Sequence, residues 1–107
     1  MLDWLGCAVI GATTVPGRML VDYGRRQACS GRCHAILVGA VEASVAAFIN
    51  GGFGNILEMD DIHRTSILHP GPVVIPAALA CAQREKTTST TFLDAVIRGE
   101  EYPILGL

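Results

Sequence analysis

The hydrophobic pattern of the first quarter of the chain predicts two helices separated by a polar break. Residues 3–12 are apolar, and several of their positions can share one helical surface. The stretch 13–17, with its two threonines and its Pro-Gly pair, interrupts that surface, and Thr14 is a suitable N-cap for a new helix. Apolar residues then recur at helical spacing, which predicts a second helix over residues 16–26.

The middle of the chain mixes short apolar runs with turn residues. Residues 27–33 are predicted to be a loop, and the apolar run 35–38 is ambiguous between a strand and the start of a helix. Residues 39–49 are rich in alanine and predict a helix that another helix can approach closely. The sequence Asn-Gly-Gly-Phe-Gly-Asn at 50–55 predicts an interruption or kink, since each helical glycine costs about 1 kcal/mol. Glycines kept inside a helix would instead mark close approach of backbone or ligand.

The last part of the chain predicts a loop followed by two helices. The loop covers residues 63–72, and the next helix covers 76–86 with a proline at its first position. A final helix presents an apolar face made of Phe92, Val96 and Gly99, and Pro103 ends it. The predicted fold class is therefore all-α, with at most one short extended piece.

Composition adds a size argument to this pattern. The chain has 107 residues, of which 50% are hydrophobic and 17% charged, with a mean hydropathy of +0.42. These values exclude a disordered chain and indicate one small domain. Because a monomer of this size buries only about 65% of its unfolded surface, we expect exposed apolar surface. A membrane, a partner or a missing remainder of the protein would have to cover it.

Charge and hydropathy exclude several classes of partner and location. The net charge is −2 and the pI about 5.8, without the basic patch that nucleic acid requires. The longest apolar run, residues 35–49, contains Glu42 and is shorter than the roughly 20 residues of a membrane span. Asp3 stands where a signal peptide would have basic residues. We therefore expect a cytoplasmic protein with no nucleic-acid or membrane partner.

The four cysteines indicate free thiols rather than a disulfide framework. Cys7 and Cys81 lie in apolar runs and are predicted to be small core residues. Cys29 and Cys33 form a C-x3-C pattern followed by His34. This spacing fits neither a typical zinc site nor an iron–sulfur site.

Most of the polar chemistry is concentrated between residues 58 and 72. The group comprises Glu58, Asp60, Asp61, His63, Arg64 and His69. Three interpretations stay open. The first is a loop with helix-capping acids, and the second is an acid–base or anion-binding site in which Arg64 clamps a carboxylate. The third is a metal site with the two aspartates and two histidines as ligands, although their spacing matches no familiar motif. The glycines at 51–54 lack the residues that make a nucleotide-binding loop.

Several stretches of the chain form a pattern of recognisable sequence motifs. The most specific is H-P-G-P-V-V-I-P-A-A-L-A at residues 69–80. It is preceded by an Asn-Gly segment and by L-E-M-D-D-I-H at residues 57–63. Two further motifs are the opening L-D-W-L-G-C-A at 2–8 and T-F-L-D-A-V at 91–96. Together these stretches resemble the MmgE/PrpD family, which includes 2-methylcitrate dehydratase and cis-aconitate decarboxylase.

This resemblance implies a fold and an activity. Family members are several times longer, with a large all-helical domain and a smaller α/β lid domain, which is absent here. They dimerise, need no metal or organic cofactor, and remove water or CO2 from small di- or tricarboxylates. By this resemblance, residues 1–107 are an incomplete N-terminal part of the helical domain, inactive alone, forming a homo-oligomer or associating with the remaining domain. The alternative is a non-catalytic helical module that docks on a larger partner.

The resemblance also assigns roles to the polar residues. His69 stands where the family has an active-site histidine, and His69 and Asp60 are the predicted catalytic residues. The predicted substrate-binding residues are Glu58, Asp61, His63 and Arg64. Ile62 stands where a threonine is common in the family, so a hydroxyl contact is lost. The departures at Glu58 and Ile62 leave the particular substrate open.

Overall fold

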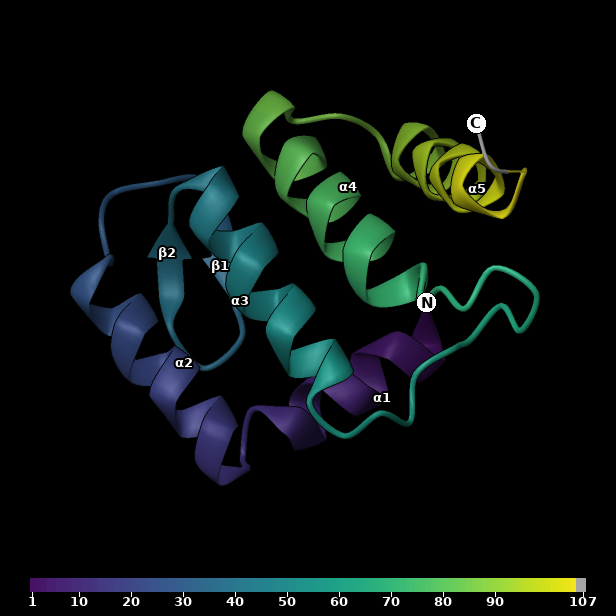
Figure 1. The fold of residues 1–107 in the computed structure, drawn as a ribbon. Coiled ribbons are helices and arrows are strands. Elements are labelled where there is room, and N and C mark those ends of the chain that lie inside the picture. Colours follow the sequence, from purple (N-terminus) through teal and green to yellow (C-terminus); the bar gives the residue numbers. More distant parts are fainter. Residues whose placement is uncertain (106–107) are drawn as a thin grey trace.

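Helices dominate the computed structural model of the chain, which describes residues 1–105 and the side chains of residues 1–101 (Figure 1). The elements in order are α1 (Leu2–Gly11), α2 (Val15–Arg26), β1 (Cys33–Ala35), β2 (Gly39–Val41), α3 (Ala43–Asn55), α4 (Gly71–Glu85) and α5 (Ser89–Leu105). The prediction of a largely helical domain is confirmed. The all-α class is not, because β1 and β2 form a two-stranded antiparallel sheet.

The two N-terminal helices follow from local signals and lie where they were predicted. α1 buries one face, from Trp4 through Cys7 and Ala8 to Gly11, at the spacing of successive helical turns. α2 begins after Thr14, whose Oγ1 accepts a hydrogen bond from the Gly17 N–H at 3.1 Å. The cap and the spacing of the buried residues are both local features of the chain, so the sequence alone predicts these two helices.

The β-hairpin covers the run 35–38, which the sequence left ambiguous between a strand and the start of a helix, and also the first residues of the helix predicted from residue 39. Cys33 pairs with Val41 and Ala35 with Gly39, and the Val38 N–H donates to the Ala35 carbonyl at 3.1 Å. The turn places Gly39 at φ 101° and Leu37 at φ 58°. A leucine at positive φ is unusual, so the turn carries no sequence signal of the Asn-Gly kind. The helix predicted from residue 39 therefore begins only at Ala43.

α3 is the central element, and it continues through the glycines that were predicted to interrupt it. It packs against α1, α2, α4 and β1, and buries Ile49 and Phe53 completely (Figure 1). The glycines allow this packing. A Cβ at Gly51 would lie 2.8 Å from the Pro72 carbonyl oxygen, and one at Gly54 would lie 2.5 Å from Trp4 Nε1. Packing at close range outweighs the low helix propensity of glycine here.

α4 begins five residues earlier than predicted, and α5 extends past the predicted stop. α4 starts at Gly71, so Pro76 lies inside the helix, where it is buried. The early turns of the helix are held by hydrogen bonds from the Gly71 N–H to the Asp61 carboxylate and by contact with α3. α5 continues to Leu105, so Pro103 does not end it. The predicted face of α5 is confirmed at Val96, which is buried, and at Gly99, which lies against Val74.

The cysteines divide into two buried and two exposed thiols, all free. Cys7 is a core residue as predicted, but Cys81 is exposed, and Cys33 is buried instead. The Cys33 thiol donates to the Ala80 carbonyl oxygen at 3.2 Å. Burial raises the pKa of both the Cys7 and the Cys33 thiol, since desolvation disfavours the thiolate. Both therefore stay protonated and unreactive in the folded chain.

Large apolar side chains remain on the surface, as the composition predicts. Leu2 is 84% exposed, Met19 69% and Ile97 58%. Within residues 1–105, no single helix has both the length and the apolar character to cross a bilayer. α1 and α2, bent by 87° relative to each other, meet such criteria only as a broken pair, by length and composition.

Candidate active site

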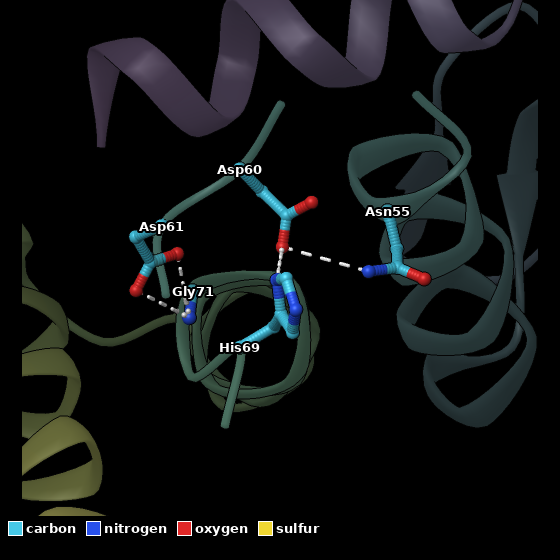
Figure 2. A network of polar contacts seen from close by, with 5 residues as sticks. All are labelled: Asn55, Asp60, Asp61, His69 and Gly71. Atoms are coloured by element: carbon cyan, nitrogen blue, oxygen red, sulfur yellow. Dashed lines mark hydrogen bonds and ion pairs between the residues drawn. The ribbon is translucent and has the colours of Figure 1, made fainter. Parts of the chain in front are cut away.

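The predicted catalytic residues, His69 and Asp60, contact each other directly. Both lie on the segment that joins α3 to α4, and His69 Nδ1 is 2.7 Å from Asp60 Oδ2 (Figure 2). Their environments differ strongly: the Asp60 side chain is 1% exposed, whereas the His69 side chain is 35% exposed. The pair therefore consists of a buried carboxyl group behind a histidine ring that reaches the surface.

The Asp60 carboxyl group lies between the His69 ring and α1 (Figure 2). The Asn55 side-chain amide, at the end of α3, donates to the same Oδ2 atom at 3.5 Å. The other oxygen, Oδ1, is buried and has no hydrogen-bond partner among the described residues. A buried carboxylate needs such contacts to offset its desolvation, and here they converge on the oxygen that faces His69.

Asp61 has a different role from its neighbour. Its Oδ1 and Oδ2 accept from the Gly71 N–H at 3.1 and 3.3 Å, at the first residue of α4 (Figure 2). A carboxylate at this position satisfies a free helical N–H and complements the positive end of the helix dipole. A side chain at residue 71 would collide with this carboxylate, which explains the glycine there. For Asp61 the structure therefore gives a helix-capping role.

The remaining predicted site residues are not gathered around His69. His63 Nδ1 contacts Ser66 Oγ at 2.5 Å, within a turn closed by the His63 N–H donating to the Leu68 carbonyl at 2.8 Å. Glu58 and Arg64 are exposed. In the described part of the chain, no three histidine, cysteine, aspartate or glutamate side chains converge as metal ligands. The four ligands of the metal interpretation are thus divided between a pair, a helix cap and a turn.

A surface cleft of about 420 Å³ lies between α3 and the start of α4, and His69 lines it. The other lining residues are Ala47, Phe48, Gly51, Gly52, Asn55, Pro72 and Val73. Of the six predicted site residues, all within the described part of the chain, His69 alone is on this wall. The glycines were the one sequence signal for the cleft. Phe48, Asn55 and Val73 carried none, because only the packing of α3 against α4 brings them together.

The arrangement can support proton transfer at the cleft. An imidazole whose Nδ1 is held by a carboxyl group has its other nitrogen, Nε2, free to exchange a proton with a bound molecule. The rest of the wall is mostly apolar, and among the described residues no lysine or arginine lines it. The cleft thus offers one acid–base group and apolar contacts, but no cation to hold a carboxylate.

Known proteins are similar to this chain over nearly its whole length. Cis-aconitate decarboxylase of Aspergillus terreus is 31% identical over 99% of the chain. The cis-aconitate decarboxylase-like protein oryM of Aspergillus oryzae is 27% identical over 94% of it. The chain spans 23% of the length of each of these relatives. No solved structure matches the chain.

A family comparison covers nearly the whole chain as well. The MmgE/PrpD N-terminal domain matches residues 1–104, including both halves of the Asp60–His69 pair and the two helices that form the cleft. This match confirms the resemblance found in the sequence motifs. Over nearly its whole length, including the His-Pro-Gly segment that presents His69, the chain therefore belongs to the MmgE/PrpD family.

Proposed function

We propose that this chain supplies the acid–base part of a lyase site that acts on a small di- or tricarboxylate. The observation that carries the proposal is His69, held by a buried carboxyl group on the wall of a cleft. Membership of a family whose curated relatives include cis-aconitate decarboxylase supports the substrate class. The reaction class is removal of CO2 or of water from the carboxylate.

His69 has a defined task in either reaction. In decarboxylation, the bond between carbon and the departing carboxylate breaks, its electron pair stays on the carbon, and a proton takes the place of CO2. The protonated His69 ring donates that proton from Nε2. In dehydration, the neutral ring removes a proton from carbon at Nε2, and the electron pair of the C–H bond forms the double bond. The C–O bond breaks, and the leaving hydroxide takes up the proton from the ring and departs as water. Positioned acid–base groups of this kind contribute about 100-fold to 10,000-fold in rate.

Binding of the substrate carboxylates requires groups outside the cleft wall. Carboxylates in a water-poor site need cationic partners, and arginine is the usual bidentate one. Arg64 is exposed on the connecting segment and does not line the cleft. We therefore infer that cations from additional polypeptide complete the site, and that residues 1–107 alone have no turnover. The chain then provides the proton-transfer group of a site that it shares with this additional polypeptide.

A chimera tests the role of His69. The chain replaces the matching 23% of Aspergillus terreus cis-aconitate decarboxylase, and CO2 release from cis-aconitate is measured. We expect His69→Ala to lower kcat at least about 100-fold, while the exposed His34→Ala on β1 leaves it unchanged. The matching histidine of the intact Aspergillus terreus enzyme is changed in parallel. Turnover within about threefold of the parent in both proteins, less than acid–base catalysis contributes, would falsify the proposal.

A non-catalytic docking module is the second candidate, and one observation favours it. α1 leaves Leu2, Leu5 and Val9 exposed at successive turns, a stripe that a helical partner could cover. For such a module, light scattering on the isolated chain is expected to show association beyond the 11.3 kDa of one copy. A single-copy mass together with a cooperative thermal transition would count against it.

A further inference from the structure

We infer that Asp60 is a positioning residue that selects Nε2 of His69 as the nitrogen that exchanges protons with the substrate. The inference rests on the proposed function, since it names the reacting atom of the same site. It also separates two residues that the sequence grouped as catalytic. Asp60 does not line the cleft and its side chain is 1% exposed, so it cannot touch a substrate bound there.

The selection follows from the hydrogen bond between the two residues. An ionised carboxylate only accepts, so the hydrogen between Asp60 Oδ2 and His69 Nδ1 belongs to the ring nitrogen. The donation from Asn55 to the same Oδ2 fits an oxygen that accepts rather than one that carries a proton. The neutral ring is then protonated at Nδ1, and its lone pair is at Nε2. Because the Asp60 carboxyl group occupies Nδ1, Nε2 is the ring nitrogen left for a molecule in the cleft that His69 lines.

The successive carboxylates Asp60 and Asp61 fix the ring in place by separate contacts. Asp60 holds the His69 side chain, and Asp61 holds the backbone N–H of Gly71 two residues later. The first contact sets the ring's protonation pattern and rotation, while the second sets where α4 begins and hence where residue 69 lies. Such a division predicts different consequences for otherwise identical substitutions at the two aspartates.

Nitrogen NMR on the uniformly 15N-labelled 107-residue chain tests the inference without any substrate. Spectra are recorded over a pH series, and the tautomer is determined from the signals of the neutral form of the ring. His69 is assigned by comparison with His69→Gln. We expect a pyrrole-type signal for Nδ1 and a pyridine-type signal for Nε2 in the parent chain. The opposite pattern, with the proton on Nε2, or fast averaging of the two tautomers, would overturn the inference.

Two matched variants refine the test. Asp60→Asn can donate its amide N–H to Nδ1, so we expect it to move the His69 proton to Nε2. Asp61→Asn keeps an acceptor for the Gly71 N–H. We expect it to leave the His69 tautomer unchanged, although it replaces the carboxylate next to Asp60 in the sequence. Circular dichroism establishes that each variant is folded before its spectrum is compared. An unchanged tautomer in folded Asp60→Asn would contradict the positioning role.

Kinetics in the chimera separate this inference from the proposed function. We expect Asp60→Asn to lower kcat about 100-fold with KM changed less than about threefold, because the residue acts through His69 and not on the substrate. A change confined to KM would show that Asp60 contributes to binding and not to positioning. If His69→Ala proves harmless, the lyase proposal fails while the NMR result stands. If the tautomer is reversed, the positioning role fails while the lyase proposal stands.

Discussion

Gly11→Ala is expected to destabilise the folded chain by more than about 4 kcal/mol, a large part of the ~5–15 kcal/mol available to a small domain. A Cβ at Gly11 would overlap the carbonyl oxygen of Phe53 and lie 3.1 Å from its carbonyl carbon. The obstacle is backbone in the last turn of α3, which cannot rotate away as a side chain can. Urea titration followed by circular dichroism measures the loss, and a chain that no longer folds at all agrees with it.

Gly6→Ala on the same helix is the matched control. A Cβ at Gly6 meets nothing within 4 Å, so only the intrinsic preference for alanine acts. We expect this variant to be more stable than the parent by about 1 kcal/mol. If the two substitutions changed the free energy of unfolding equally, the close packing of α1 on α3 would be contradicted.

The glycines show where sequence reasoning about the fold stops. Those at Gly51, Gly52 and Gly54 were expected to interrupt a helix, because propensity is a property of the local chain. Their effect in the fold depends instead on Pro72, Leu20 and Trp4, which are distant in sequence. Capping by Thr14 was predictable because donor and acceptor lie three residues apart. Contacts between distant helices have no such local signature.

The candidate site, like the fold, was predictable from the sequence only in part. The sequence located the polar cluster and identified His69 and Asp60, which the structure brings together at 2.7 Å. The different roles predicted for Asp60 and Asp61 came from the family resemblance, because adjacent aspartates look alike in the sequence until the start of α4 and the position of α1 are known. Asp61 caps a helix whose start was predicted five residues too late. Family resemblance supplied candidate roles for these positions, and the geometry differentiates the two aspartates.

The sequence did not predict the β-hairpin as a whole, because part of its support comes from a side chain of α3 that is distant in sequence. Asn50 in α3 is 3% exposed, and its Oδ1 accepts from the Ile36 N–H at 2.9 Å. Its Nδ2 donates to the His34 carbonyl, also at 2.9 Å. One side-chain amide thus satisfies a donor and an acceptor at the end of β1, as a neighbouring strand would. Fourteen residues separate Asn50 from Ile36, so the pattern around the hairpin does not reveal this contact.

Asn50→Leu is therefore expected to destabilise the chain by about 3 kcal/mol, because it removes two hydrogen bonds and leaves two backbone groups unpaired against the core. For a domain of this size that corresponds to a fall in Tm of roughly 15 °C. Calorimetry measures it directly. The hairpin is expected to loosen first, so amide exchange at Ile36 accelerates more than exchange at residues of α1.

Gln83→Leu provides the comparison that isolates burial. Gln83 Oε1 accepts from the His34 N–H at 3.0 Å, so it too is a side-chain amide bound to the backbone of β1. This contact is exposed, and water can replace it, so we expect a loss below about 1 kcal/mol. Equal losses for the two variants would mean that the hairpin is held by its own strand pairing. A loss several times larger for Asn50→Leu places the hairpin's stability in α3, the same helix that forms one wall of the cleft beside His69.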